Sequence, residues 1–211
     1  MSAEAFIRAH TAIGTAPLVP ELRLHLGSAV TPIWEATEAW LAQRNVAPPF
    51  WAFAWPGGQA LARHLLDHPA LAAGRRVLDF AAGSGLAAIA AARAGGMATA
   101  CDIDPLAAAA IGLNAALNGV RVAASAADPV GRDEGWDLIL CGDVCYEAPM
   151  TRHILPWLRA LAARAEVWVA DPGRAYLPRE GLDPFAHYTV PTTLDLEDRP
   201  ERKVVLYRLR P

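Results

Sequence analysis

Lysine is nearly absent from this chain of 211 residues. Lysine and arginine together number 19 against 22 acidic residues, which gives a net charge of −3 and a pI near 6.1. Lys203 is the single lysine in the sequence. A protein that holds nucleic acid on a general basic surface has an excess of such side chains. The composition therefore argues against direct nucleic-acid binding, and we interpret the preference for arginine as compositional bias.

Cysteine is also scarce, and long apolar runs are missing. Cys101, Cys141 and Cys145 are an odd number on or near apolar segments, which does not fit a disulfide framework. With no further ligands near them we expect buried thiols and no metal site. The start of the chain lacks the parts of a signal peptide, and no run reaches the ~18–20 apolar residues that cross a bilayer. We therefore expect a cytoplasmic protein without membrane contact, and we further expect it to be a monomer.

What the chain does have, from Arg76 onward, is a regular alternation of short apolar strands and helices. The expected strands cover 76–80, 97–102, 120–125, 136–142 and 166–170, and the expected helices cover 86–94, 105–117 and 149–164. Two closing strands, 188–194 and 203–209, have no helix between them. This order predicts an α/β fold with a mostly parallel sheet, helices on both faces and an antiparallel C-terminal hairpin.

We interpret residues 1–48 as an N-terminal extension packed on a catalytic domain that covers 49–211. The pair Pro48-Pro49 breaks the chain there, and an aromatic segment from Phe50 to Gln59 follows. The elements expected before the first strand of the sheet are a weak helix over 3–13, a strand over 21–26, a helix from Thr31-Pro32 onward and a helix over 59–66.

The most informative stretch is the glycine-rich turn from Asp79 to Gly85. Gly83 and Gly85 permit a tight turn and the close approach of a ligand, and the following helix offers unpaired N–H groups. Gly83 to Ala88 fits the dinucleotide pattern G-x-G-x-x-G/A, with Asp102 about 20 residues on. The acid and two glycines also fit the loop of S-adenosylmethionine-dependent methyltransferases. The turn alone leaves both cofactors open, together with a turn that binds none.

The rest of the chain favours S-adenosylmethionine. A nicotinamide enzyme needs a second half-sheet or a substrate domain, whereas only about 110 residues follow Asp102. S-adenosylmethionine needs one loop for its amino-acid part, one acid for its ribose and one edge for its adenine. We assign these to Asp79 with Gly83 and Gly85, to Asp102, and to the loop with Ala127 and Asp128. Asp104 is expected to cap the next helix.

Asp143 and Tyr146 form an Asp-x-x-Tyr element after the 136–142 strand, close to where the methyl group should point. Methyl transfer is an in-line displacement, so positioning supplies most of the rate. An amine acceptor must be neutral before it attacks, and a carboxylate can take or steer its proton while aromatic walls desolvate it. We therefore assign a catalytic role to Asp143, with a helix N-cap as the alternative.

These residues resemble the seven-β-strand protein lysine methyltransferases, and more closely the electron transfer flavoprotein β-subunit lysine methyltransferases. The likeness is carried by 49–60, by Asp102 to Pro105 with Asn114 and Asn118, and by 171–174. It implies a class I methyltransferase with a Rossmann-like, seven-stranded sheet. It also implies methylation of lysines on the flavoprotein β subunit, next to its dehydrogenase-recognition loop. Because the second segment is shared with ribosomal-protein methyltransferases, a ribosomal-protein lysine is the alternative substrate.

The resemblance also implies roles for individual side chains. Trp55 would pack on the cofactor, Asp143 would hold the target ammonium and Tyr146 would wall the acceptor channel, while Asp171 and Arg174 would shape its rim. The candidate site therefore comprises the catalytic residues Asp143 and Tyr146, the cofactor-binding residues Trp55, Asp79, Ala81, Gly83, Gly85, Asp102, Ile103, Ala127 and Asp128, and the substrate-binding residues Phe53, Asp171 and Arg174.

Overall fold

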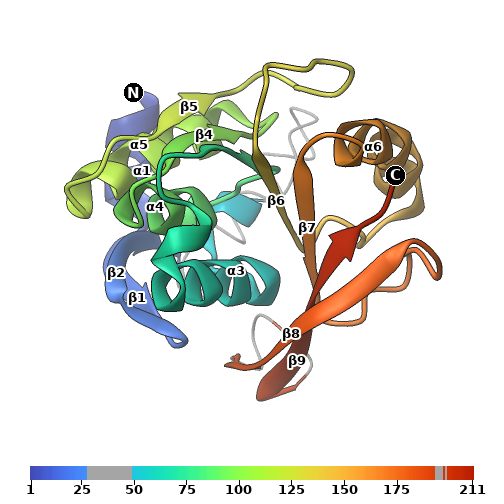
Figure 1. Ribbon diagram of the computed structural model, residues 1–211. Coiled ribbons are helices and arrows are strands. Elements are labelled where there is room, and N and C mark those ends of the chain that lie inside the picture. Colours follow the sequence, from blue (N-terminus) through green and yellow to red (C-terminus); the bar gives the residue numbers. More distant parts are fainter. Residues whose placement is uncertain (28–48, 193–196, 198) are drawn as a thin grey trace.

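The computed structural model of the protein describes residues 1–27, 49–192, 197 and 199–211. The helix expected from Thr31-Pro32 lies outside them, and the expected domain boundary lies at their edge. The described residues form a seven-stranded sheet, a two-stranded hairpin and flanking helices (Figure 1). In chain order the elements are α1 (Ala3–His10), β1 (Ala12–Ala16), β2 (Val19–Leu26), η1 (Phe50–Ala52), α3 (Pro56–Asp67), η2 (Pro69–Leu71), β3 (Arg76–Phe80), α4 (Leu86–Arg93), β4 (Met97–Cys101), α5 (Pro105–Leu117), β5 (Ala123–Ser125), β6 (Leu138–Gly142), α6 (Ala148–Ala162), β7 (Glu166–Asp171), β8 (Leu182–Pro191) and β9 (Glu201–Leu209).

The large sheet has the strand order β5-β4-β3-β6-β7-β9-β8. Strands β3 to β7 pair in parallel, whereas β9 runs antiparallel to both β7 and β8. The chain builds from β3 through β4 to β5 and then returns to the other side of β3 with β6. The carboxyl ends of β3 and β6 therefore adjoin where the strand order reverses, which is where open α/β sheets bind ligands. The expected sheet with its antiparallel C-terminal hairpin is confirmed.

Helices cover both faces of the sheet. Successive residues of a strand point to opposite sides, and because the central strands carry apolar residues on both sides, both faces need to be covered. Val77 and Leu140 belong to a core cluster shared with α3, α4 and α5, whereas Leu78 and Ile139 belong to a cluster shared with α6. Figure 1 shows α6 on one side of the sheet and the other three helices on the opposite side. Burying one such side chain contributes about 1.5–3 kcal/mol, so the two clusters fix the strands that carry the site.

Two asparagines on and just after α5 hold the N-terminal hairpin β1-β2 in place. Asn118 accepts a hydrogen bond from the Arg23 backbone N–H and donates one to the Arg23 carbonyl, as a neighbouring strand would. Asn114 is fully buried, accepts from the His25 backbone N–H at 2.7 Å and donates to the Ser84 carbonyl at 2.9 Å. Since Ser84 lies in the glycine-rich turn, Asn114 links the N-terminal segment to that turn.

The bounds of several elements differ from the sequence expectation, and β5, expected over 120–125, covers only Ala123–Ser125. The first helix ends early, at His10, because Ala12–Ala16 pairs with β2 as a strand. Helix α3 begins earlier than expected, at Pro56, since proline suits the first helical position. Strand β8 also begins earlier, at Leu182, and the register shift beside Pro184 accommodates a proline that only an edge strand tolerates.

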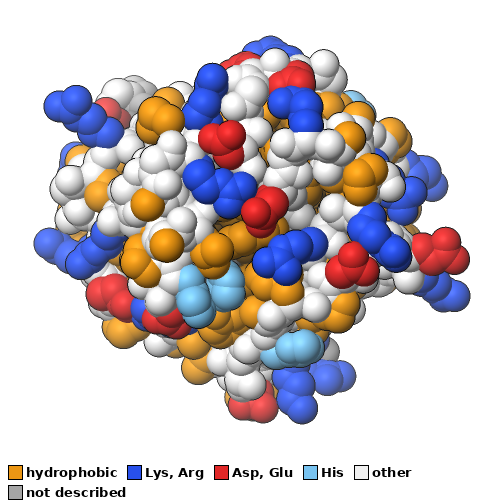
Figure 2. All heavy atoms as spheres, in the orientation of Figure 1, with side chains coloured by type: hydrophobic (Ala, Val, Ile, Leu, Met, Phe, Trp, Pro, Cys, Tyr) orange, Lys and Arg blue, Asp and Glu red, His pale blue; other side chains and the backbone are white. Residues whose placement is uncertain are grey.

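The cysteines and the charged side chains lie where the composition predicts. The three cysteines are buried and free, which confirms the expectation of buried thiols. On the face drawn in Figure 2, Lys and Arg side chains are interspersed with Asp and Glu side chains. Within the described ranges, no helix combines the length and the apolar character that crossing a membrane requires.

We expect Asn114→Ala to lower the free energy of unfolding by about 2–6 kcal/mol. The change leaves the His25 N–H and the Ser84 carbonyl buried without partners, at a cost of about 1–3 kcal/mol each. Asn118→Ala is the matched control at the end of the same helix, and because water can reach this partly exposed position it should lose no more than about 1 kcal/mol. Urea unfolding measures both variants, and equal losses would contradict this account of the link.

Candidate functional site

A cavity of about 600 Å³ opens at the carboxyl ends of β3 and β6. Its size lies within the range of about 300–1,000 Å³ that is typical of small-molecule sites. It is lined by Phe50, Trp51, Trp55, Phe80, Ala81, Gly83, Cys101, Asp102, Ile103, Asp104, Ala107, Asp128, Pro129, Gly142, Asp143, Val144, Tyr146, Glu147, Pro149, Met150, His153, Ile154 and Arg174. Ala81 and Asp143 have φ angles of 52° and 56°. This left-handed backbone is strained for residues with a Cβ, and such strain clusters at ligand sites.

The glycine-rich turn after β3 brings backbone to the cavity. Gly83, with a φ angle of 51°, lines the cavity, and its N–H donates to Oδ2 of Asp102 at 2.9 Å. Gly85, with a φ angle of 75°, caps α4, and a Cβ there would lie 2.8 Å from the Ile111 side chain. Glycine is therefore required at Gly85 for its conformation and also for space.

Asp102 and Asp104 have separate roles at the end of β4. Asp102 accepts hydrogen bonds from the backbone N–H groups of Gly83 and Asp104. Asp104 accepts from the Leu106 N–H at 2.8 Å and caps α5, which confirms the cap expected from the sequence. A carboxylate has about four acceptor positions, so Asp102, which lines the cavity, can still accept a hydrogen bond from a ligand.

Asp79 lies outside the cavity lining. Its buried carboxyl group accepts a hydrogen bond from the Ala88 N–H in α4 at 2.8 Å. Burial raises its pKa from 3.8 to about 8, so the group is mostly protonated at neutral pH. Asp79 therefore attaches α4 to β3 in this structure, and its carboxyl group carries little charge.

Asp143, directly after β6, is held from two sides. Its Oδ2 accepts the N–H of Gly57 in the first turn of α3, where the helix dipole favours negative charge. Its Oδ1 accepts two hydrogen bonds from Arg174, from Nε at 3.0 Å and from Nη2 at 2.7 Å. Burial raises the pKa of Asp143 to about 6, although the Arg174 charge opposes this. Asp143 is therefore a buried carboxylate that is mostly ionised at neutral pH.

Two glycines, one in the first turn of α3 and one at the end of β6, allow this helix to approach the strand closely. A Cβ on Gly57 would lie 2.6 Å from both the Ala170 carbonyl oxygen and Oδ2 of Asp143. A Cβ on Gly142 would lie 2.9 Å from the backbone nitrogen of Gly58. Side chains at Gly57 and Gly142 would therefore force the helix away, and the N–H of Gly57 would no longer reach Asp143.

Aromatic rings form one wall of the cavity. The Phe50 ring centroid lies 5.7 Å from those of Trp55 and Tyr146. The Trp55 Nε1–H donates to the Phe50 carbonyl at 2.9 Å, which fixes the indole. Trp51 also lines the cavity, and its buried Nε1–H has no partner in the described part of the chain.

Acidic groups outnumber cationic ones in the lining. The carboxyl groups are those of Asp102, Asp104, Asp128, Asp143 and Glu147, and the groups that can carry positive charge are Arg174 and His153. His153 Nε2 lies 3.1 Å from Oδ2 of Asp128. A cleft with an excess of one sign attracts ligands of the opposite sign. The cavity therefore suits a cationic ligand, and no cluster of metal-binding side chains occurs among the described residues.

The cavity brings together most of the residues identified from the sequence. Those that line it are Trp55, Ala81, Gly83, Asp102, Ile103, Asp128, Asp143, Tyr146 and Arg174. Those outside the lining are Phe53, Asp79, Gly85, Ala127 and Asp171. Asp171 accepts the N–H groups of Gly173 and Arg174 at 2.7 and 2.6 Å. It therefore shapes the turn that carries Arg174.

Sequence reasoning missed the contribution of α6. Met150, His153 and Ile154 line the cavity from the first turns of this helix. Their spacing places them on one face, so helical periodicity after Asp143 was a usable signal. It also missed Glu197, whose carboxylate binds Arg174. Glu197 lies far along the chain and carries no local pattern.

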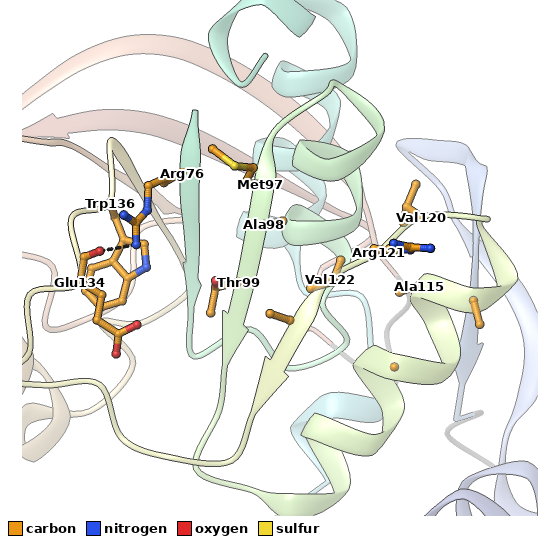
Figure 3. A pocket seen from close by; sticks show the side chains of 13 residues that line it. Arg76, Met97, Ala98, Thr99, Ala115, Val120, Arg121, Val122, Glu134 and Trp136 are labelled. Carbon is orange, nitrogen blue, oxygen red and sulfur yellow. Dashed lines mark hydrogen bonds between the residues drawn. The ribbon is translucent and has the colours of Figure 1, made fainter. Parts of the chain in front are cut away.

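A second, open hollow of about 1040 Å³ lies at the opposite end of the strands (Figure 3). Arg76 and Met97, at the starts of β3 and β4, lie on its border together with Val120 and Val122. Arg76 donates to the Glu134 carbonyl there. Ligands of open α/β sheets bind at the carboxyl ends of the strands, so this hollow is not the candidate site.

Comparison with known sequences gives two kinds of match. The family model of the ribosomal protein L11 methyltransferase (PrmA) matches residues 60–142. The electron transfer flavoprotein beta subunit lysine methyltransferase of Xenopus laevis is 39% identical over 196 residues, which cover 88% of this chain and 78% of that protein. Its Danio rerio counterpart is 37% identical, over 88% of this chain and 74% of that protein. The Homo sapiens counterpart is 34% identical, over 90% of this chain and 74% of that protein.

Comparison with solved structures shows the fold. The magnesium protoporphyrin IX methyltransferase of Synechocystis with bound SAM has a TM-score of 0.55 at 17% identity, over 74% of this chain and 80% of that one. A putative RNA methyltransferase of Pyrococcus horikoshii has a TM-score of 0.56 at 16% identity, over 78% and 89%. The seven-stranded α/β architecture is therefore that of class I methyltransferases.

We expect Gly57→Ala to destabilise the protein by roughly 2–4 kcal/mol, because its Cβ overlaps the Ala170 carbonyl and the Asp143 carboxylate. Gly58→Ala is the matched control, since nothing lies within 4 Å of a Cβ there. In a helix that control should gain up to about 1 kcal/mol. Denaturant unfolding compares the two, and a harmless Gly57→Ala would refute the close approach.

We expect Asp79→Asn to remove part of the pH dependence of stability. The folded-state pKa of Asp79, about 8, lies above its ordinary value of 3.8, so the folded protein binds the extra proton between these values. Its stabilising contribution is complete below about pH 4 and is lost as the pH rises through about 8.

The amide oxygen introduced by Asp79→Asn can still accept the Ala88 N–H, so this variant should be more stable than the natural protein at about pH 9. Unfolding experiments at acidic and alkaline pH measure the difference. A pH-independent difference between the two proteins would show that Asp79 does not titrate as described.

Proposed function

The chain belongs to the family of the electron transfer flavoprotein beta subunit lysine methyltransferases, and we propose that it methylates lysines of that beta subunit with S-adenosylmethionine as the methyl donor. The cavity described above is the proposed site of both cofactor and target lysine. The observation that carries the proposal is Asp143, a buried and mostly ionised carboxylate in an aromatic cavity with excess negative charge.

The size of the cavity and its acidic lining suit S-adenosylmethionine. Gly83 lines the cavity without a side chain and so leaves room for the amino-acid part of the cofactor, and Asp102 has acceptor positions left for ribose hydroxyl groups. Ile103 and Asp128 would supply the edge for the adenine, and Trp55, which lines the same cavity, would pack on the cofactor. When bound, this cofactor supplies an electrophilic methyl group on a positively charged sulfur. The acidic lining therefore complements the charge of the cofactor as well as that of the lysine.

Three of the residues outside the lining support the cofactor site indirectly. Asp79 holds α4 behind the glycine-rich turn, and Gly85 lets that helix start against Ile111. Ala127 lies beside Asp128, and its N–H donates to the Ser125 side chain. These residues act by fixing the positions of the loops.

On the acceptor side, Asp143 binds the target amine and the aromatic residues exclude water around it. A lysine enters as an ammonium ion and is attracted by the Asp143 carboxylate. Removing water around the amine favours its neutral form, which has the lone pair needed for attack. Tyr146 and Phe50 form the wall of this channel. Rate enhancement comes mainly from holding the nitrogen in line with the methyl group.

Phe53, Asp171 and Arg174 support the substrate side of the site. The Phe53 ring lies 6.1 Å from Trp55 and backs the aromatic wall. Asp171 orders the turn that carries Arg174, and Arg174 lies at the rim beside Asp143. A ribosomal-protein lysine is the alternative target, favoured by the family model that matches residues 60–142.

Incubation of the protein with radiolabelled S-adenosylmethionine and the purified electron transfer flavoprotein tests the proposal. We expect label on lysines of the beta subunit and none on the alpha subunit. Extract from cells that lack this protein is the second substrate. Label on a ribosomal protein in place of the beta subunit would transfer the function to the alternative, and no label on any protein would refute lysine methylation.

Asp143→Asn should lose at least about 100-fold in turnover while the cofactor dissociation constant changes little, because the carboxylate acts on the amine. In the natural enzyme kcat/KM for the protein substrate should fall as the pH drops through about 6, where Asp143 takes up a proton. Calorimetry measures binding and the label assay measures turnover. Near-normal turnover of the Asp143→Asn variant would exclude this role.

A further inference from the structure

The Arg174 guanidinium lies between two buried carboxylates. Its Nη2 is 2.7 Å from Oδ1 of Asp143 and 2.6 Å from Oε1 of Glu197. The two acidic side chains are 9% and 3% exposed, whereas Arg174 is 20% exposed. One nitrogen therefore touches both carboxylates, and the arginine is the more exposed of the three.

Glu197 lies between β8 and β9 in the chain, and a second arginine binds its other oxygen. Arg202 Nε and Nη2 lie 2.9 and 2.7 Å from Oε2 of Glu197. Asp143, Arg174, Glu197 and Arg202 thus form a row of alternating charges with no net charge. A buried charge is tolerated when it remains paired, and each member of this row has a neighbour of opposite sign.

Arg174 takes up acceptor positions that a lysine ammonium needs. Oδ1 of Asp143 accepts two N–H groups from Arg174, and Oδ2 accepts one from Gly57. A carboxylate has about four such positions, so one position remains, on Oδ2, and the negative charge is already neutralised by Arg174. An incoming ammonium can pair fully with Asp143 only when Arg174 releases Oδ1.

We propose that in the free enzyme Arg174 occupies the position on the Asp143 carboxylate that the ammonium group of the target lysine later takes. When the lysine displaces Arg174 from Asp143, Glu197 is the positioning residue that retains Arg174. This inference rests on the proposed lysine methylation. The exchange requires no new partner, because Nη2 already contacts Glu197. Both buried carboxylates stay paired before and after the exchange.

The titration of Asp143 reports this arrangement in the free enzyme. Two charged groups face Asp143: Arg174 lowers the pKa of Asp143, and Asp171 raises it. The Cys145 thiol is also close to Asp143. Glu197 does not contact Asp143 directly but binds the other side of Arg174. Arg174→Met should therefore raise the pKa of Asp143. Glu197→Gln should lower it, because Arg174 then has Asp143 as its main carboxylate partner.

Kinetics on the intact flavoprotein substrate provide the main test. We expect Glu197→Gln to raise KM for the protein substrate about tenfold with a smaller change in kcat, because Arg174 competes more strongly for Asp143. At about pH 9, where Asp143 is ionised, Arg174→Met should have a KM equal to or below that of the natural enzyme. Glu201→Gln, at an exposed position on the same hairpin, is the matched control and should change neither value.

A double-mutant cycle separates this exchange from a merely structural role. If Glu197 acts through Arg174, then Glu197→Gln should have no further effect on KM in the Arg174→Met background. An equal, additive loss of kcat in both backgrounds would overturn the proposal. The cofactor dissociation constant of each variant checks that the fold is intact, and it should remain within about twofold of the natural value.

Carbon-13 NMR titration of Asp143 in the free enzyme gives a readout that does not depend on activity. Opposite shifts of its pKa in the Arg174→Met and Glu197→Gln variants support the exchange. Shifts in the same direction overturn it, even if the flavoprotein is methylated. If the natural enzyme labels no flavoprotein, the proposed function fails, while the titration still decides whether Glu197 controls Arg174.

Discussion

The hydrogen bond from the Gly57 N–H to the Asp143 carboxylate is the contact on which the rest of the site depends. It joins the first turn of α3 to the end of β6, and it exists only because Gly57 and Gly142 leave no side chain between the two backbones. It also accompanies the left-handed backbone of Asp143, at a φ angle of 56°. The energetic cost of the strained backbone and of burying the charge of Asp143 is thus offset by the helix N-terminus and by Arg174.

Local sequence patterns were sufficient to place the parallel strands along the chain and to identify part of the site. The parallel strands are short apolar segments bounded by acids and glycines, so their order and the cofactor turn were visible in the sequence. Asp104 caps its helix as expected. The cavity also gathers Asp143, Tyr146 and Trp55 as the resemblance implied. These features depend on residues that are close in sequence, or on strand ends that any parallel sheet brings to one edge.

Features that depend on distant residues were not visible. The pairing of β1 with β2 overrode a weak helical tendency, and the edge position of β8 made Pro184 acceptable within a strand. Glu197 reaches Arg174 because the hairpin packs beside β7, and no pattern around residue 197 indicates this contact. The sequence therefore indicates which groups perform the chemistry more readily than which charges surround them.

Asp79 and Asp143 show why those surroundings decide function. Both are acids at the carboxyl ends of adjacent strands, and both are buried. Burial raises the pKa of Asp79 to about 8, because a single N–H hydrogen bond opposes it and the charge of Asp102 adds to it. Asp143 has a helix N-terminus and an arginine, so its pKa stays near 6. At neutral pH the first acid is mostly an uncharged support and the second a charge that can bind a cation. Two residues of one type thus differ in role because of their partners.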